Sequence, residues 1–122
     1  MDQATQQDAR RGLVIVFTGH GKGKTTAALG LLLRACGHDM RVRMLQFIKA
    51  MGSDAGEHRM AKRLGLQIVP LGAGFTWDEA ATLSHAEAAR MAWEAACQVI
   101  AQSAADVLIL DEITFAFQNR WL

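Results

Sequence analysis

The chain has 122 residues, of which 51% are hydrophobic and 20% charged, and a formal net charge of +1. These values fit one globular domain of ordinary composition. The charge argues against nucleic acid or an anionic membrane as the main partner, because neither would meet a broad basic surface. Residues 1–11 lack the apolar core of a signal peptide, and no apolar run reaches membrane-spanning length. We therefore expect a cytoplasmic protein with a flexible segment at 1–11 and one domain at 12–122.

Strands and helices are predicted to alternate from residue 13 onward. Apolar runs rich in β-branched residues, or with alternating polarity, favour strands, and glycines following helical patterns favour helix ends. The predicted elements are strands at 13–18, 41–48, 66–69 and 106–110, and helices at 24–36 and 57–64. Such alternation is typical of a parallel sheet with right-handed crossovers, whose ligand binds at the carboxyl ends of the strands.

A longer helix is predicted before the last strand, and its start is ambiguous. Thr76 with Glu79 and Ser84 with Glu87 both fit the capping box, in which a hydroxyl and a carboxylate satisfy each other's backbone N–H groups. The apolar stripe that follows ends near Ser103. Trp93 lies at the margin of this stripe and is interpreted as a core residue.

The segment 12–26, GLVIVFTGHGKGKTT, predicts a phosphate-binding loop. A buried strand, a tight glycine loop and a helix start occur in the order that such a site requires. Gly19, Gly21 and Gly23 allow backbone N–H groups to crowd around phosphate oxygens. Lys24 is placed to reach the outer phosphates, and the hydroxyl of Thr25 can ligate Mg²⁺. The pattern predicts binding of a nucleoside triphosphate.

The spacing within this loop is unusual. The common pattern has four residues between its first glycine and the Gly-Lys-Ser/Thr group. Here three residues separate Gly19 from Gly23, and Thr18 occupies the usual first-glycine position. The alternative interpretation is a glycine-rich turn that carries a lysine without function.

Asp111 and Glu112 follow the last predicted strand and form the second candidate element of the site. A carboxylate at the end of a buried strand can hold Mg²⁺ opposite the Thr25 hydroxyl. The alternative is an ordinary solvated turn, and the spacing does not decide which of the two acids would contact the metal.

Taken together, several motifs resemble those of the phosphate-loop ATP:corrinoid adenosyltransferases of the cobalamin pathway. The motifs occur in one order and cover nearly the whole chain from Leu13 onward. They are GHGKGKTTAALG, Arg34, QFIK at 46–49, Gly56-Glu57, GFTW at 74–77, Trp93 and LDEIT at 110–114.

The resemblance implies an α/β, three-layer P-loop NTPase (RecA-like) fold with a mainly parallel sheet, apparently truncated after the fourth strand. It also implies transfer of the 5′-deoxyadenosyl group of ATP to Co(I) of a reduced corrinoid, with triphosphate as leaving group. The short loop would hold the triphosphate reversed, so that the ribose carbon faces cobalt. By matching position, the ATP-binding residues would be Gly19, His20, Gly21, Lys22, Gly23, Lys24, Thr25, Thr26 and Arg34.

The remaining roles implied by the resemblance concern metal, corrinoid and partners. Thr25 and Glu112 would serve Mg²⁺, with Asp111 as the other candidate, and Lys24 would stabilise the leaving triphosphate. Phe75 and Trp77 would line the corrinoid site and displace its lower axial ligand. A homodimer and an electron donor such as a flavoprotein reductase are the expected partners.

Several of these residues also have structural interpretations. Arg34 could extend along its helix to solvent, and Phe75 and Trp77 could plug their loop onto the sheet. His20 stands where the family more often has asparagine.

Other histidines and the cysteines are assigned no chemistry. His58 and His85 are predicted at the surface. Cys36 and Cys97 are predicted to be buried free thiols, because both lie in apolar helical surroundings. Two functions compete with adenosyl transfer, namely a generic P-loop NTPase or kinase and an ATP-binding remnant without turnover.

Overall fold

A computed structural model describes residues 12–74 and 84–122 of the chain. In these ranges three strands form one parallel sheet, with spatial order β2–β1–β3. The strands are β1 (Val42–Ala50), β2 (Gln67–Gly72) and β3 (Val107–Asp111). The strand β1 is central, and helices pack against both of its faces.

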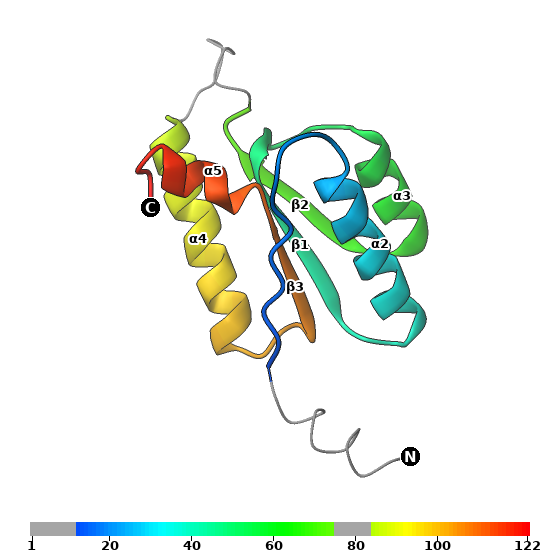
Figure 1. Cartoon of the computed structure of the whole chain (residues 1–122). Coiled ribbons are helices and arrows are strands. Elements are labelled where there is room, and N and C mark those ends of the chain that lie inside the picture. Colours follow the sequence, from blue (N-terminus) through cyan, green and yellow to red (C-terminus); the bar gives the residue numbers. More distant parts are fainter. Residues whose placement is uncertain (1–11, 75–83) are drawn as a thin grey trace.

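Four helices in the described residues complete a three-layer α/β/α arrangement. They are α2 (Lys24–Gly37), α3 (Gly56–Leu64), α4 (His85–Ala101) and α5 (Ile113–Gln118). Figure 1 shows α2 and α3 on one side of the sheet and α4 and α5 on the other. The predicted α/β class with a parallel sheet is confirmed. None of the helices described is long and apolar enough to span a lipid bilayer.

Alternate side chains of β1 pack into two separate hydrophobic clusters, one on each face of the sheet. Val42 and Met44 pack with Leu32 of α2, whereas Leu45 and Phe47 pack with alanines of α4 and with Ala116 of α5. Successive residues of a strand point to opposite faces, so a strand covered on both sides must be apolar at both parities. Two polar residues interrupt the run: Arg43 is half-buried, whereas Gln46 is fully buried.

The strand predicted at 13–18 is wrong for this structure. The segment has no strand assignment, and Figure 1 draws it as a tube rather than an arrow. Its side chains are exposed, with Leu13 82% and Val14 89% accessible. The apolar run suits a strand buried on both faces, but a strand also needs a hydrogen-bonded neighbour, and β3 pairs only with β1 here.

The bounds of the other predicted strands and helices agree with the structure within a few residues. Two differences remain. The strand predicted at 66–69 extends through Pro70 to Gly72; a proline is tolerated there because β2 is an edge strand of the sheet described. Helix α5 was not predicted.

Of the two candidate starts for the long helix, the structure shows a cap at Ser84. Its hydroxyl accepts the N–H of Glu87 at 3.1 Å, and the Glu87 carboxylate accepts the N–H of Ser84 at 3.4 Å. Thr76 and Glu79 lie outside the described residues.

Two burial predictions on α4 are wrong. Trp93 is 38% exposed, and Cys97 is exposed, while Cys36 on α2 is half-buried; both thiols are free, as predicted. The face of α4 that meets the sheet is lined by alanines, namely Ala88, Ala89, Ala92 and Ala96. Trp93 follows Ala92 by about 100° of helix rotation and therefore points off this face.

A clamp between Arg41 and Asp106 fixes the amino ends of β1 and β3. The guanidinium donates to both carboxylate oxygens, at 2.9 and 3.2 Å, and to the Ser103 carbonyl at 2.9 Å. The backbone N–H of Arg41 also donates to Asp106, at 2.8 Å. Five residues further along, the same register pairs Gln46 with Asp111.

Acid should weaken this clamp. Hydrogen bonds from Arg41 lower the pKa of Asp106 from its ordinary 3.8 to about 2. A carboxyl group with a lowered folded-state pKa contributes stability above its ordinary pKa and loses it as the pH falls through the folded value. The free energy of unfolding, measured by urea denaturation, should therefore fall between about pH 4 and about pH 2. Asp106→Asn should reduce stability at neutral pH and flatten this acid-dependent loss, whereas Asp39→Asn at an exposed turn should not. An acid dependence identical in Asp106→Asn and the unmodified chain would contradict this.

Candidate phosphate-binding site

The glycine loop adopts a conformation that only glycine enters without strain. Gly19, Gly21 and Gly23 have φ values of 123°, 93° and 108°. A Cβ built on any of them meets no atom within 4 Å, so backbone conformation rather than crowding requires glycine here. The space beside the loop backbone is therefore open to a ligand.

The loop leads directly into the N-terminus of α2. Gly23 is the N-cap residue and supplies no side-chain cap, and the first turn contains no acidic residue. The first N–H groups of a helix have no partner within it, and the helix dipole is positive at that end. Thr25 and Thr26 lie in this first turn. The combination is the standard backbone arrangement for binding phosphate.

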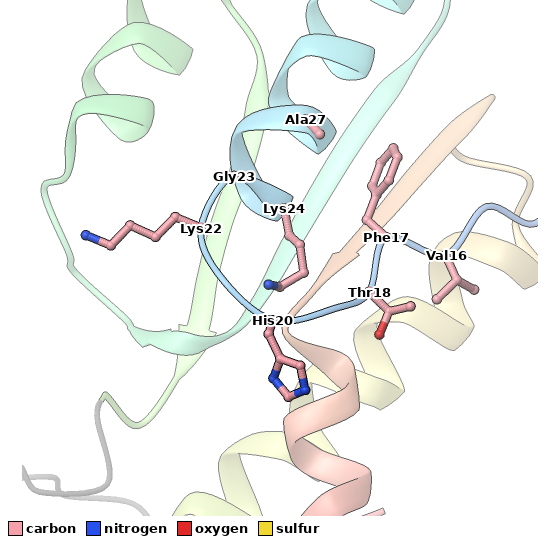
Figure 2. A pocket seen from close by; sticks show the side chains of 8 residues that line it. All are labelled: Val16, Phe17, Thr18, His20, Lys22, Gly23, Lys24 and Ala27. Carbon is pink, nitrogen blue, oxygen red and sulfur yellow. The ribbon is translucent and has the colours of Figure 1, made fainter.

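An open depression of about 370 Å³ lies against this loop. Figure 2 shows the Lys24 side chain folding back under the loop and Lys22 extending away from it. The ammonium group of Lys24 donates to the carbonyls of Gly19, at 2.8 Å, and Gly21, at 2.7 Å. The residues that line the depression are Val16, Phe17, Thr18, His20, Lys22, Gly23, Lys24 and Ala27.

Thr25 and Asp111 meet at the carboxyl end of the sheet, although 86 positions separate them in sequence. The Thr25 hydroxyl donates to Oδ1 of Asp111 at 3.0 Å. Glu112 directly follows, is exposed and has a left-handed φ of 62° as the N-cap of α5. The hydroxyl and carboxylate oxygens are ligand types that Mg²⁺ accepts.

These residues fit a metal that is shared with a nucleotide rather than held by protein alone. In the described ranges, 12–74 and 84–122, no group of three or more His, Cys, Asp or Glu side chains could hold a metal ion. Mg²⁺ is commonly bound through one or two carboxylates together with substrate phosphates. The Thr25–Asp111 pair beside the glycine loop matches that requirement.

A buried polar network behind Asp111 was missed by the sequence reasoning. Oδ2 of Asp111 accepts the side-chain amide of Gln46 at 3.3 Å, and the same amide lies 3.4 Å from Oε1 of Glu57. Glu57 also forms an ion pair with Lys49. Partial burial raises the pKa of Glu57, but hydrogen bonds from Lys49, from backbone and from Gln46 outweigh it, so the pKa is lowered overall.

His58 belongs to this network, and its predicted surface location is wrong. The side chain is 5% exposed, and its Nε2 lies 2.6 Å from Oε1 of Gln46. The available signal was Gln46 itself, a polar residue inside the apolar strand VRMLQFI. A polar residue there needs partners, and they come from α3 and from Asp111 of β3.

The remaining predicted site residues divide into two groups. Arg34 is exposed in the last turn of α2, about 15 Å along the helix from Lys24 at about 1.5 Å per residue. The structure does not bring it to the glycine loop. Phe75 and Trp77 lie outside the described residues.

The chain leading to residue 75 is fixed to the end of β1. A Cβ on Gly72 would overlap the backbone of Ile48, so β2 can approach β1 there only with glycine. The N–H of Gly74 then donates to the Ile48 carbonyl at 3.0 Å. Gly74, the last described residue before the gap at 75–83, therefore lies at the end of the sheet that also carries Asp111.

Comparison with known proteins gives a consistent result. The family model for ATP:corrinoid adenosyltransferase BtuR/CobO/CobP matches residues 10–122. A corrinoid adenosyltransferase of Escherichia coli (strain K12) is 41% identical over 120 residues, covering 98% of this chain and 61% of that protein. Corrinoid adenosyltransferase CobA of Salmonella typhimurium is 36% identical, with the same coverage, and one from Pseudomonas aeruginosa is 33% identical over 99% of this chain and 60% of its own length. The chain thus spans about three fifths of the length of these relatives.

Two glycine substitutions distinguish the effect of the loop conformation on stability from the effect of helix propensity. Gly23→Ala should destabilise the fold by about 1–2 kcal/mol, the cost of a left-handed backbone for a residue with a Cβ. Gly30→Ala, at an exposed position within α2, should stabilise by about 0.5–1 kcal/mol. Urea unfolding of both variants measures the two effects. Equal effects of the same sign would show that the loop does not keep this conformation.

Proposed function

This chain belongs to the ATP:corrinoid adenosyltransferase family, and on that premise we propose that it transfers the 5′-deoxyadenosyl group of ATP to a corrinoid. The acceptor is the Co(I) centre of a reduced corrinoid, and triphosphate is released. The observation that carries this proposal is the contact between Thr25 and Asp111 directly beside the glycine loop. It joins a phosphate-binding backbone to a carboxylate suited to a nucleotide-bound cation.

The loop and α2 would bind the triphosphate through backbone N–H groups and Lys24. The Lys24 ammonium already donates to two carbonyls of the loop. Phosphate oxygens carry more negative charge than carbonyls and form stronger charge-assisted hydrogen bonds, so a bound triphosphate would take over these donors. His20, Lys22 and Thr26 contribute from the same segment.

Thr25 and Asp111 would hold Mg²⁺ together with phosphate oxygens, with Glu112 as the adjacent carboxylate. When bound, Mg²⁺ neutralises charge that develops on the departing triphosphate. The protein's own part is to keep the Thr25 hydroxyl and the Asp111 carboxylate facing the loop. Their hydrogen bond shows that both side chains can reach one point.

The reaction needs no protein nucleophile or general base. The cobalt–C5′ bond forms as the C5′–O bond breaks, and the bonding electron pair leaves with the triphosphate oxygen. Catalysis is then mainly electrostatic, through donors placed where negative charge grows. The short loop, with three residues between Gly19 and Gly23, supports a reversed triphosphate that presents carbon rather than phosphorus to the nucleophile.

Corrinoid binding is assigned by the same proposal to the segment that follows Gly74. Phe75 and Trp77 are its aromatic residues, and the preceding Gly74 is bonded to Ile48 at the end of the sheet where the nucleotide would lie. Arg34 lies at the far end of α2 and is left out of the proposed triphosphate site.

Assembly and electron supply complete the proposal. Exposed apolar side chains on α2 and α4, including Leu33, Met91 and Ile100, support a protein partner such as a second copy of the chain. An electron donor of the flavoprotein reductase type is required because Co(I) must be generated by reduction. The cytoplasm is the proposed location.

Anaerobic incubation with ATP, Mg²⁺ and chemically reduced cobalamin tests the function. The adenosylcobalamin absorption spectrum should develop with release of one triphosphate per corrinoid. Release of ADP and phosphate would instead indicate an ordinary NTPase or kinase. ATP binding without any product would identify a binding module.

Lys24→Met tests the phosphate-binding site. Because the substitution removes the ammonium group while keeping a similar length, ATP affinity measured by calorimetry should fall at least tenfold, which corresponds to about 1.4 kcal/mol. Lys62→Met on the exposed face of α3 removes the same charge elsewhere and should leave the affinity unchanged. Equal affinities of the two variants would contradict the assignment of Lys24.

A further inference from the structure

The Asp111 carboxylate is held on both of its oxygens. Oδ1 accepts the Thr25 hydroxyl at 3.0 Å, and Oδ2 accepts the Gln46 amide at 3.3 Å. Thr25 lies on the nucleotide side of the carboxylate, whereas Gln46 lies behind it on β1. The β1–β3 register places Gln46 and Asp111 as direct partners, which fixes this geometry in the sheet.

The orientation of the Gln46 amide is determined by its neighbours. Ionised carboxylates only accept hydrogen bonds, so the NH₂ end must face Asp111 and Glu57. The carbonyl end then faces His58 Nε2, at 2.6 Å. Nδ1 of His58 accepts the backbone N–H of Ala55 at 3.0 Å, so the proton of the neutral ring is on Nε2 and is donated to Gln46.

A chain of hydrogen bonds, all donating in the same direction, therefore connects the N-terminus of α3 to the Asp111 carboxylate beside the glycine loop. Ala55 donates to His58, His58 to Gln46, and Gln46 to Asp111. Gln46 is 0% exposed, and in the described residues every buried side-chain nitrogen and oxygen has a partner. A fully satisfied buried network of this kind holds its members in one arrangement.

Charge balance supports the same assignment. The Gln46 amide donates to two carboxylates, those of Asp111 and Glu57. An unpaired negative charge on Glu57 would repel the nearby charge of Asp111. Glu57 is paired with Lys49, which offsets that charge. Asp111 is left as the carboxylate that faces Thr25.

We propose that Gln46, oriented by His58, is a positioning residue that aims the Asp111 carboxylate at the cation site. This rests on the proposed function, since it assumes that Asp111 and Thr25 hold the Mg²⁺ of bound ATP. It adds that β1 and α3, which do not contribute to the glycine loop, control the metal dependence of nucleotide binding. Residues that hold a metal ligand from behind typically change metal affinity about 10–100-fold when they are replaced.

Gln46→Met tests the inference, because methionine keeps the length of the side chain but cannot donate a hydrogen bond. ATP affinity is measured by calorimetry in EDTA and in excess Mg²⁺, and the ratio of the two dissociation constants gives the gain due to the metal. In Gln46→Met this gain should shrink about tenfold or disappear, while ATP affinity in EDTA stays unchanged. Gln67→Met, an exposed glutamine on the neighbouring strand β2, is the matched control and should keep the full gain.

A pair of His58 variants keeps the test decisive should Gln46→Met fail to fold. A glutamine side chain can place its amide where Nε2 lies, whereas asparagine is too short. His58→Gln should therefore retain most of the Mg²⁺-dependent gain, and His58→Asn should lose it. Equal, unchanged gains in His58→Asn and His58→Gln, or an unchanged gain in Gln46→Met, would overturn the inference.

The proposed function fails separately. If the unmodified chain bound no ATP, or bound it equally well in EDTA and Mg²⁺, the nucleotide–metal site itself would be refuted. A metal-dependent gain in the unmodified chain that persists in every variant refutes only the positioning role.

Discussion

The parallel pairing of β1 with β3 is the constraint on which the candidate site depends. At one end of the pair, the Arg41–Asp106 clamp sets the register. At the other, that register places Gln46 next to Asp111. A slip of β3 by one residue would turn Asp111 to the opposite face of the sheet, away from Gln46 and α2. The clamp is exposed and lies at the opposite end of the strands from the candidate site, yet the site's geometry follows from the register that the clamp helps to fix.

The site is an example of side chains that converge although they are distant in sequence. Thr25 comes from the first turn of α2 and Asp111 from the end of β3. Gln46 and His58 come from β1 and α3 on the same face of the sheet. In a parallel α/β fold all these points lie at or near the carboxyl edge, where ligands bind. The polar interior is tolerated because each buried donor and acceptor is matched, whereas an apolar replacement of any one member would leave its neighbour unpaired.

Much of this arrangement could be predicted because local patterns carry it. The glycine spacing, the helix that follows, and the alternation along β1 each depend on neighbouring residues. The capping box at Ser84 is equally local. The sequence contained two matches to this motif, and the structure shows that α4 begins after the one at Ser84. The glycine φ values agree with the predicted loop because positive φ is a property of single residues.

What could not be predicted depends on long-range partners. The run 13–18 has the composition of a strand, but its state depends on whether a neighbour is available to pair with it. His58 looks like a surface residue on a charged helix, but it is buried against Gln46, a partner on a different element. Trp93 is exposed because the small alanines of α4 already fill the contact with the sheet.

The central claim is that carbon, not phosphorus, is attacked. ATP labelled with ¹⁸O at the oxygen that joins C5′ to the α-phosphate distinguishes the two directly. Under anaerobic conditions with reduced corrinoid, the account predicts that the label leaves entirely with released triphosphate, since the C5′–O bond breaks. Recovery of the label in ADP or another adenosine-containing product would show cleavage at phosphorus and contradict the account.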